Sequence, residues 1–316
     1  VYLGVDVGSI STKGVLITRD RQVVAQTYLA TQGNPLLAIK NLLKSLQAQV
    51  KHIKVVGVGT TGSARRLAGV MIGADVIKNE IIAHALASSY YYPETRTIIE
   101  IGGQDSKIIV LQDRIPIDFA MNNVCAAGTG SFLEHQAIRL GIPIQEFGSY
   151  ALKAKNKITI AGRCTVFAES DMVHKAQLGI AVEDIIQGLC DAIVRNYLNT
   201  VAKGKKIEPL ILFQGGVAAN IGVKTAFERA LNQLVIVPEH FLTMGAIGAA
   251  LIAQEQHQMK KTTNFAGFEI VELNFTTKAF QCPDCPNNCE IIETYRAQNL
   301  IDRYGDRCGK WSESMS

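Results

Sequence analysis

Two cysteines in this sequence lie just ahead of segments with a helical pattern. Cys125 stands in the segment 122–134, shortly before the glycine-rich turn Gly128-Thr129-Gly130. Cys164 precedes a helical run from Phe167 to Leu178. The N–H groups and the dipole at a helix start favour negative charge, so a thiolate, or a metal cluster that it holds, is stabilised there. Free cysteines are also often small buried hydrophobic residues, and these two positions alone leave both interpretations open.

The segment from Asp6 to Ile17 recurs, without a gap, from Glu100 to Leu111. An acid, an apolar residue, a glycine, a hydroxyl residue and a lysine follow in the same order and lead into an apolar strand, 94 positions apart as residues 6 and 100 are. Glycine in a hairpin turn lets backbone N–H groups approach phosphate oxygens, while hydroxyls and lysine add donors and positive charge. We therefore predict two hairpins that bind a polyphosphate from both sides, in two similar α/β halves.

Each hairpin supplies candidate nucleotide ligands. One hairpin alone would also fit a surface turn, but the matched pair favours phosphate binding. Asp6 ends a strand, where its carboxylate suits Mg²⁺ directly or through water. The spacing is neither GxGxxG nor GxxxxGK[ST], which disfavours Rossmann and Walker-type sites. The predicted binding residues are Gly8, Ser9, Ser11, Thr12, Lys13, Gly102, Gly103, Gln104 and Ser106, and the candidate catalytic carboxylates are Asp6, Glu100 and Asp105.

A later glycine pair, Gly215-Gly216, follows an expected strand at 209–213 and precedes a helix that ends near Leu231. It permits close backbone approach to a nucleoside, to which Asn220 can hydrogen-bond. The alternative is a plain tight turn between a strand and a helix.

Length and composition narrow the class of protein. The chain has 316 residues, enough for about two domains, and its 47% hydrophobic and 19% charged content is that of an ordinary globular protein. A formal net charge of +4 gives no case for nucleic acid, and no apolar run approaches the length of a membrane span. Seven cysteines that are not spaced as a disulfide framework favour a reducing cytoplasm. The start at Val1 fits a piece of a longer protein.

The tail, residues 259–316, has a different character, with four of the seven cysteines and the single Trp. Cys282, Cys285, Cys289 and Cys308 follow the pattern C-x2-C-x3-C-x18-C, which suits a structural Zn²⁺ or a second Fe–S cluster; a tail without metal also remains open. Elsewhere, Cys190 has apolar neighbours in a helix and is predicted to be core. We expect His84, one turn after Glu80, to be packed or hydrogen-bonded rather than catalytic.

The apolar patterns predict alternating strands and helices. Asn34-Pro35 should cap a helix whose apolar face holds Leu36, Ile39, Leu42, Leu43 and Leu46. The helix from 244 to about 259 is rich in Gly and Ala, which permits close packing against a neighbouring helix. Strands are expected at 1–7, 14–19, 23–30, 53–58 and 234–237, with a further strand beginning at 96, and helices at 63–70, 80–90, 129–141, 145–154, 168–178 and 182–203.

Together these motifs resemble a known superfamily. Two hairpin phosphate loops and a later Gly-Gly turn are similar to the sugar-kinase/Hsp70/actin ATPases. The stretches GVDVGSISTK, IGGQDSK, NNVCAAGTGSFLE and GRCTVFAESD resemble the activators of 2-hydroxyacyl-CoA dehydratases, of the BadF/BadG/BcrA/BcrD ATPase family. The resemblance covers about 1–258. It implies an α/β fold with two RNase H-like (actin-like ATPase) halves around a nucleotide cleft, 1–92 with 243–258 and 93–242, followed by a small Cys-rich metal-binding tail at 259–316.

The resemblance also implies an activity. In that family ATP hydrolysis drives a low-potential electron onto a partner dehydratase or reductase component, and a ferredoxin or flavodoxin supplies the electron. ATP and Mg²⁺ would be held by the hairpins with Gly215 and Gly216, and Cys125 and Cys164 would ligate a [4Fe–4S] cluster. Such a cluster usually takes four thiolates, so two chains would share it in a homodimer. The alternatives are a small-molecule kinase of the same fold, with Asp105 as base, and a non-catalytic nucleotide-binding regulatory module.

Overall fold

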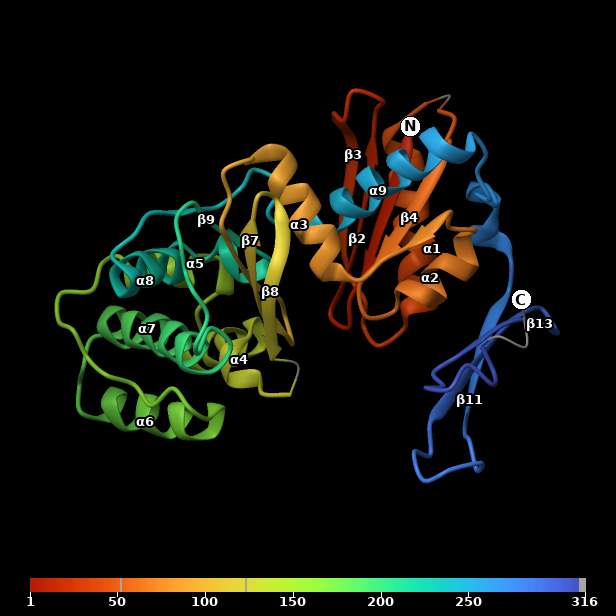
Figure 1. Cartoon of the computed structure of the whole chain (residues 1–316). Helices are drawn as coiled ribbons and strands as arrows, with labels where there is room; N and C mark the ends of the chain where they lie inside the picture. The colour runs from red at the N-terminus through yellow and green to blue at the C-terminus, as the bar shows by residue number, and fades with distance from the viewer. Residues whose placement is uncertain (52, 123, 313–316) are drawn as a thin grey trace. The chain divides into compact units, whose positions relative to one another are not determined.

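The computed structural model describes residues 1–51, 53–122 and 124–312. It divides the chain into two compact units, one formed by Val1–Glu80 with Gly245–Ser316 and the other by Ile81–Met244. Each unit is built on its own five-stranded sheet, and a third sheet of three short strands lies in the tail (Figure 1).

The first unit begins with the predicted antiparallel meander. Its sheet has the order β3-β2-β1-β4-β5, in which β4 pairs in parallel with β1 and β5 pairs in parallel with β4. The strands are β1 (Tyr2–Val7), β2 (Ser11–Ile17), β3 (Val23–Ala30), β4 (Gly57–Thr61) and β5 (Val76–Ile77), with helices α1 (Pro35–Gln49), α2 (Arg65–Ile72) and α9 (Met244–Lys260).

Helix α1 starts as the sequence predicts. The Asn34 side chain accepts a hydrogen bond from the backbone N–H of Leu37 at 3.0 Å, and Pro35 occupies the first helical position. This satisfies one of the donors that a helix start leaves without an intrahelical partner. The apolar face of α1 is buried against β2 and β3, and its buried members include Ile39, Leu42, Leu43 and Leu46.

Helix α9 packs closely on the strands of this sheet, and the expected packing against a neighbouring helix stays a prediction. A Cβ added to Gly4 of β1 would lie 1.9 Å from the carbonyl oxygen of Ala246, and one on Gly59 of β4 would lie 2.1 Å from that of Ala249. Glycine on the strands and alanine on the helix thus let two backbones touch. Gly59 pairs in register with Gly4 of β1, so β4 runs from Gly57 to Thr61 and not over the expected 53–58.

The sheet of the second unit repeats the first. Its order is β10-β9-β6-β7-β8, and Glu100 pairs with Lys107 across its first hairpin as Asp6 pairs with Lys13 in β1–β2. The repeat of 94 positions is therefore confirmed in the register of the two hairpins. The strands are β6 (Thr97–Ile101), β7 (Ser106–Gln112), β8 (Ile115–Asn122), β9 (Ile211–Gln214) and β10 (Val235–Ile236).

Helix α7 (Val182–Thr200) lies at the centre of the second unit's core (Figure 1). Cys190 on this helix is fully buried, as predicted, and burial raises the pKa of its thiol to about 12. None of the helices within the described ranges is long and apolar enough to cross a membrane. The remaining helices are α3 (Glu80–Tyr91), α4 (Gly130–Leu140), α5 (Ile144–Ala151), α6 (Thr165–Gln177) and α8 (Ile221–Leu231).

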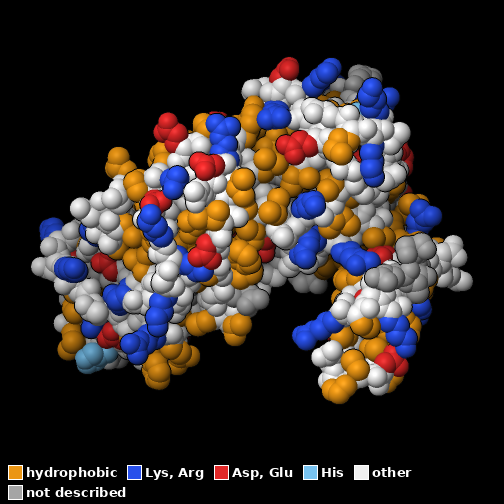
Figure 2. Space-filling view, viewed as in Figure 1, with side chains coloured by type: hydrophobic (Ala, Val, Ile, Leu, Met, Phe, Trp, Pro, Cys, Tyr) orange, Lys and Arg blue, Asp and Glu red, His pale blue; other side chains and the backbone are white. Residues whose placement is uncertain are grey.

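No bounds were predicted for strand β8, although its apolar residues alternate along the chain. It forms the edge of the sheet, and its alternate side chains Ile115, Ile117 and Phe119 are exposed. Figure 2, drawn in the same view as Figure 1, shows hydrophobic side chains gathered in the region of β8.

The start of the tail contributes to the core of the first unit. Ile270 in the short 3₁₀ helix η3 (Phe268–Glu272) and Phe275 are buried in the same apolar cluster as the residues of α1. Arg66 of α2 also forms an ion pair with Asp302 at 3.2 Å. Beyond η3 the tail forms an antiparallel sheet of β11 (Phe275–Gln281), β12 (Glu290–Arg296) and β13 (Asn299–Tyr304).

Candidate functional site

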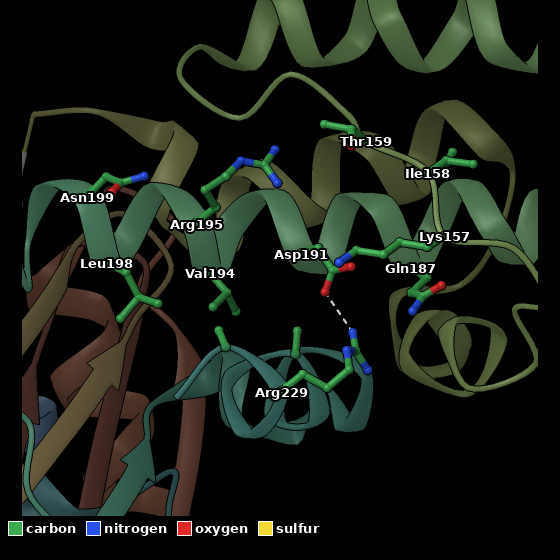
Figure 3. A pocket seen from close by; sticks show the side chains of 12 residues that line it. Lys157, Ile158, Thr159, Gln187, Asp191, Val194, Arg195, Leu198, Asn199 and Arg229 are labelled. Carbon is green, nitrogen blue, oxygen red and sulfur yellow. Dashed lines mark hydrogen bonds and ion pairs between the residues drawn. The ribbon is translucent and has the colours of Figure 1, made fainter. Parts of the chain in front are cut away.

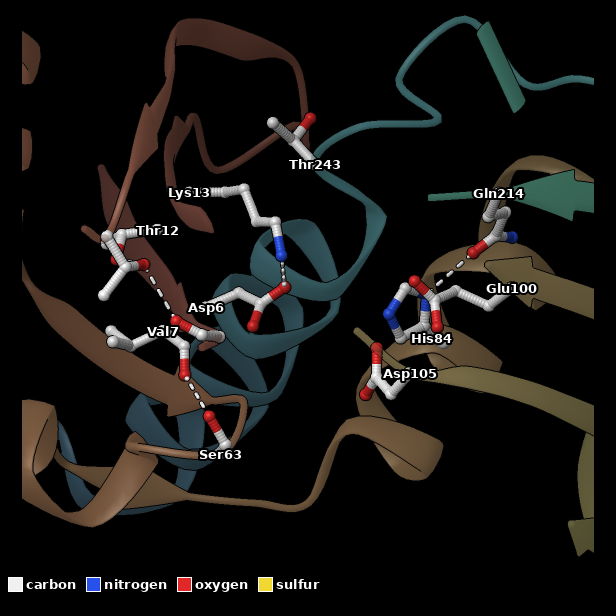
Figure 4. A network of polar contacts seen from close by, with 12 residues as sticks. Asp6, Val7, Thr12, Lys13, Ser63, His84, Glu100, Asp105, Gln214 and Thr243 are labelled. Carbon is white, nitrogen blue, oxygen red and sulfur yellow. Dashed lines mark hydrogen bonds and ion pairs between the residues drawn. The ribbon is translucent and has the colours of Figure 1, made fainter. Parts of the chain in front are cut away.

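The β1–β2 turn has an exposed tip and a partly exposed lysine. The N–H of Gly8 donates to the carbonyl oxygen of Ser11 at 2.9 Å, which closes the turn. Lys13 forms an ion pair with the buried Asp6 at 3.2 Å and keeps 18% of its side chain exposed (Figure 4). Ser9 is exposed at the tip of the turn. Ser9 and Lys13 thus have exposed side chains at this turn, and their role in phosphate binding stays a prediction.

Two hydroxyls predicted to bind nucleotide lie inside the sheet. Thr12 is fully buried, and its hydroxyl shares a hydrogen bond of 2.9 Å with that of Thr31. Ser11 is also buried. The hydroxyl of Thr31 in turn donates to the carbonyl oxygen of Gly8 at 2.8 Å. Thr12 therefore supports the turn from within, and its role as a direct nucleotide ligand stays a prediction.

The β6–β7 turn is closed by the same backbone hydrogen bond as the first turn, but its lysine is buried. The N–H of Gly102 donates to the carbonyl oxygen of Asp105 at 2.9 Å, the equivalent of the bond in the first turn. Lys107 is only 2% exposed and pairs with Glu100 at 2.8 Å and with Asp105 at 2.6 Å. Gln104 is exposed at the tip, while Ser106 is fully buried with no hydrogen-bond partner for its hydroxyl among the described residues.

Tyr197 supports this hairpin from α7. Its hydroxyl donates to the backbone carbonyl of Lys107 at 2.7 Å. Burial, together with the negative charge of Glu100, raises the pKa of Tyr197 well above its ordinary value. The hydroxyl therefore stays protonated and remains a donor, so the central helix is attached to the strand that carries the buried lysine.

The Gly215-Gly216 turn lies against the same carboxylate. Gly215 has a φ of 85°, and a Cβ on it would lie 2.7 Å from a carboxylate oxygen of Glu100, so only glycine suits this position. Asn220 uses its side-chain oxygen to cap α8, accepting from the N–H of Val223 at 3.1 Å. Its amide nitrogen is buried and has no partner among the described residues. The nucleoside-binding role of Asn220 is untested, whereas its helix-capping role is plain.

His84, Gln214 and Ser88 are joined by hydrogen bonds at the end of β9, just before the glycine pair. The sequence analysis identified only His84 among them. His84 is buried, and its Nδ1 lies 2.8 Å from the side-chain oxygen of Gln214, the residue before the glycine pair (Figure 4). The amide of Gln214 donates to Ser88 at 2.6 Å. His84 is thus the packed, hydrogen-bonded residue that was predicted. Gln214 carries no distinguishing sequence signal, because its place depends on the pairing of β9 with β6.

The first cysteine loop is held by an asparagine. Cys125 is exposed and caps a short 3₁₀ helix, η1 (Ala126–Gly128), rather than α4 itself. Asn122 accepts a hydrogen bond from the N–H of Cys125 at 3.0 Å, and its amide donates to the carbonyl oxygen of Cys125 at 2.7 Å. Residue 123 of the predicted segment 122–134 lies outside the described residues.

The second cysteine directly precedes its helix. Cys164 is the N-cap of α6, which starts at Thr165, two residues before the expected start. Asn196 of α7 donates to the carbonyl oxygen of Gly162 at 2.7 Å, and a Cβ on Gly128 would lie 2.9 Å from the side-chain oxygen of Asn196. One buried side chain therefore lies against both cysteine loops. A cavity of about 310 Å³ is lined by Cys125, Arg163 and Asn196, so the two loops are neighbours.

The tail cysteines are not gathered around a common point. No group of three or more Cys, His, Asp or Glu side chains within the described ranges is arranged to hold a metal ion. Cys282 is buried, and its sulfur accepts from the indole N–H of Trp311 at 3.3 Å, while Cys285 and Cys308 are exposed. The four thiols therefore do not fit a tetrahedral ion as they are placed, and a metal in the tail stays a prediction.

A further cavity of about 380 Å³ lies along α7 and is separate from these residues (Figure 3). Its charged lining includes Lys157, Arg195 and an ion pair of 2.7 Å between Arg229 and Asp191. None of the predicted site residues lines it.

Two sheets of the same strand order, each with a glycine hairpin at its centre, define an actin-like ATPase fold. A glucokinase of the ROK family from Streptomyces griseus, 12% identical with a TM-score of 0.50 over 80% of this chain, shares this fold alone. Residues 3–253 match the BadF/BadG/BcrA/BcrD ATPase family, and the chain belongs to that family.

Several named members of the family align with this chain over nearly the whole of their own length. An activator of 2-hydroxyisocaproyl-CoA dehydratase from Clostridioides difficile is 32% identical over 262 residues, which cover 80% of this chain and 95% of the relative. An activator of lactoyl-CoA dehydratase from Anaerotignum propionicum is 35% identical over 260 residues, covering 82% and 99%. A benzoyl-CoA reductase subunit from Thauera aromatica is 26% identical over 273 residues, covering 82% and 94%.

A solved structure agrees with these relatives. The activator of 2-hydroxyisocaproyl-CoA dehydratase from Clostridium difficile, with bound ADPNP, has a TM-score of 0.75 and 31% identity, over 84% of this chain and 99% of its own.

Proposed function

We propose that this protein is an ATP-hydrolysing electron donor that activates a 2-hydroxyacyl-CoA dehydratase or a benzoyl-CoA-reductase-like partner. The observation that carries the proposal is the match over nearly the whole length of relatives that are named activators of such dehydratases. The same chain has a cysteine at each of two loops that begin helical segments. A sugar kinase has no need of such a pair, so the kinase alternative is not favoured.

The two hairpins are the proposed nucleotide-binding elements. Exposed backbone and side chains at the turn tips, such as Ser9 and Gln104, supply donors for phosphate oxygens. Asp6 suits Mg²⁺ as an oxygen ligand, directly or through water. Lys13 supplies a positive charge beside it, since its ion pair with Asp6 leaves part of the side chain exposed. Glu100 and Asp105 remain the candidate catalytic carboxylates of the second hairpin.

Cys125 and Cys164 are the proposed thiolate ligands of a [4Fe–4S] cluster, which would supply one-electron chemistry at low potential. Both lie in loops that contact Asn196, and both are at least partly exposed, so the donor set fits the group. One chain offers two such thiolates where four are needed, and a two-fold homodimer provides the rest. The large apolar residues Val124, Val166 and Phe167 beside them are exposed, as a contact surface requires.

The wider setting follows from the same reaction. An electron donor of low potential must itself be reduced, and a ferredoxin or flavodoxin is the proposed source. A cytoplasmic location is proposed because reduced thiols persist there.

The test replaces one cysteine at a time by serine. Cys125→Ser and Cys164→Ser should each abolish the shared cluster and weaken the dimer, because one loss per chain removes two ligands per cluster. Three quantities are measured without oxygen: iron content, mass in solution, and absorbance at about 400 nm, where Fe–S clusters absorb. ATP binding, which uses the hairpins, should survive, while electron delivery to a dehydratase should be lost.

The matched control replaces the tail cysteines Cys282, Cys285, Cys289 and Cys308 by serine together. It should keep the shared cluster and the dimer, and any fall in iron measures what the tail holds. A single variant, Cys125→Ser or Cys164→Ser, that keeps full iron and the same dimer in this background without tail cysteines would refute the shared cluster.

A further inference from the structure

Helix α4, which follows Cys125, is capped by another part of the chain. Its N-cap residue Thr129 makes no side-chain capping bond, because the hydroxyl donates to the carbonyl oxygen of Ala126 at 2.8 Å. The first N–H groups of the helix bond instead to the β6–β7 turn. Gly130 donates to the carbonyl oxygen of Gly102 at 2.8 Å, and Ser131 donates to that of Gly103 at 2.9 Å. The turn therefore supplies the acceptors that a helix start needs.

Ser131 holds the turn twice. Its hydroxyl donates to the same carbonyl oxygen of Gly103 at 2.6 Å, so the backbone and the side chain of one residue bond to both lone pairs of one acceptor. The approach is close, since a Cβ on Gly130 would lie 3.0 Å from the carbonyl oxygen of Gly102. A helix start held in this way has to follow any displacement of the turn.

The other end of the cysteine loop is attached to the same hairpin. Asn122, the last residue of β8, pairs in register with Ser106, the first residue of β7. Asn122 is also the residue that bonds to both the N–H and the carbonyl oxygen of Cys125. The β6–β7 turn thus lies between two attachments, one to Asn122 and one to Ser131, and Cys125 lies on the segment that joins them.

The chemistry of one peptide group links this arrangement to nucleotide. The C=O of Gly103 and the N–H of Gln104 belong to one trans peptide and point in opposite directions. Gln104 is exposed at the tip of the turn, where a phosphate is proposed to bind. A peptide N–H that donates to an anion polarises its own carbonyl, which then accepts more strongly. A bound phosphate should therefore strengthen the bonds from Gly103 to Ser131, and its release should weaken them.

We propose that Ser131 is a positioning residue that couples the phosphate state of the β6–β7 turn to the segment carrying Cys125. This inference rests on the proposed nucleotide-binding role of the turn and adds the connection by which that role reaches the cysteine. The bonds to Gly103 tighten with a nucleoside triphosphate and loosen with the diphosphate. In this proposal Ser131 acts on the Cys125 segment through its bonds to Gly103 and through α4.

The experiment follows backbone hydrogen exchange in the full chain, purified without oxygen, with Mg²⁺ and either ADP or the non-hydrolysable analogue ADPNP. Peptides covering 100–106 report the turn, and peptides covering 130–137 report the start of α4. In the wild type both should exchange more slowly with ADPNP than with ADP, by about fivefold or more at α4. In Ser131→Ala the turn should keep its response, while the response at α4 should fall by at least half.

Two further variants separate coupling from general damage. Ser149→Ala removes a hydroxyl that donates within α5 to the carbonyl oxygen of Glu146 at 2.7 Å, so it is a matched change away from the turn and should leave both responses intact. Ser131→Thr keeps a hydroxyl and should restore most of the response at α4. Rescue by threonine would not be expected if alanine acted only by destabilising the helix.

The outcomes distinguish the two levels of the proposal. If the turn responds and α4 responds equally in the wild type and Ser131→Ala, the coupling role of Ser131 is wrong. If the turn responds and α4 does not respond in the wild type, the connection itself is wrong. If neither peptide responds although ADPNP binds, the turn is not the phosphate site, and the proposed nucleotide role of this hairpin fails together with the coupling.

Discussion

The β1–β2 and β6–β7 hairpins share a backbone and differ in how their lysines are held. In both, the acid of the first strand pairs in register with the lysine of the second. Lys13 forms an ion pair with Asp6 and is partly exposed, whereas Lys107 is buried and pairs with both Glu100 and Asp105. The repeated sequence therefore yields one lysine that is partly exposed and one that holds two carboxylates together.

The two turns also differ in what their first glycine carbonyl accepts. The carbonyl oxygen of Gly8 accepts from the hydroxyl of Thr31, which follows β3 of the same sheet. The equivalent oxygen of Gly102 accepts from the N–H of Gly130, at the start of α4. The first turn is thus attached to its own sheet, and the second is attached to a helix that follows Cys125. A duplicated hairpin can acquire a new role through its partners while its own backbone stays the same.

The sharpest test of this comparison is the pair of lysine-to-methionine variants, measured by urea unfolding. Lys107→Met should lower the free energy of unfolding by about 3–5 kcal/mol, because it leaves the buried Glu100 and the partly exposed Asp105 without their shared cation. Lys13→Met should cost less, about 1–2 kcal/mol, because its side chain is partly exposed. Equal losses in the two variants would contradict the different roles assigned to the two lysines.

A second variant separates loss of the cation from loss of the fold. Adding Glu100→Gln and Asp105→Asn to Lys107→Met removes the charges that the lysine neutralises. Part of the lost stability should return, because no buried charge is then left unpaired. A triple variant as unstable as Lys107→Met alone would mean that the methionine side chain, rather than the charge, is what the core does not accept.

Lys13→Met should have a large effect on ATP hydrolysis although its effect on stability is the smaller of the two. Lys13→Met should keep its fold at 25 °C and lose ATP hydrolysis by about 100-fold, since a positive charge aimed at phosphate oxygens is removed. The measurement is phosphate release at saturating ATP, with Lys40→Met as the control. Lys40 donates to the backbone carbonyl of Leu273 at 2.6 Å and is not a predicted ligand, so its loss should leave turnover unchanged. Normal turnover in Lys13→Met would remove Lys13 from the nucleotide site.

Much of this fold could be predicted because its signals are local. The capped start of α1 and the matched hairpins each depend on residues close together in the chain, and both predictions are confirmed. The partner of α9 could not be predicted in the same way. Its small residues indicate close approach, but they do not say whether a helix or a strand approaches, and that depends on Gly4 and Gly59 far away in the sequence.

The site follows the same division. Hairpin and cysteine residues stand out by type and spacing, whereas the side chains that support them do not. Asn122 and Asn196 are ordinary asparagines in the sequence, and only the fold brings them to the loops of Cys125 and Cys164. The tail shows the converse, because four cysteines at suggestive spacing are not gathered as ligands among the described residues.

The smallest expected effect comes from the attachment of the first turn. Thr31→Val removes the hydroxyl that donates to Gly8 and shares a hydrogen bond with Thr12, and it should lower the free energy of unfolding by about 1 kcal/mol. Thr27→Val is a matched control on β3, where the hydroxyl bonds to Ser45 at 2.9 Å, and it should cost a similar amount. Urea unfolding of the two variants measures both losses.

Thr31→Val and Thr27→Val should differ from Ser131→Ala in how hydrogen exchange at the start of α4 responds to nucleotide. Because the Gly8 carbonyl is attached to its own sheet, neither Thr31→Val nor Thr27→Val should change the hydrogen-exchange response of residues 130–137 to ADPNP. Thr31→Val should weaken nucleotide affinity by about threefold at most, since it loosens one turn without removing a ligand. If Thr31→Val instead suppressed the response at α4 as strongly as Ser131→Ala does, both turns would be coupled to Cys125. The contrast between an anchored turn and a coupled turn would then be wrong.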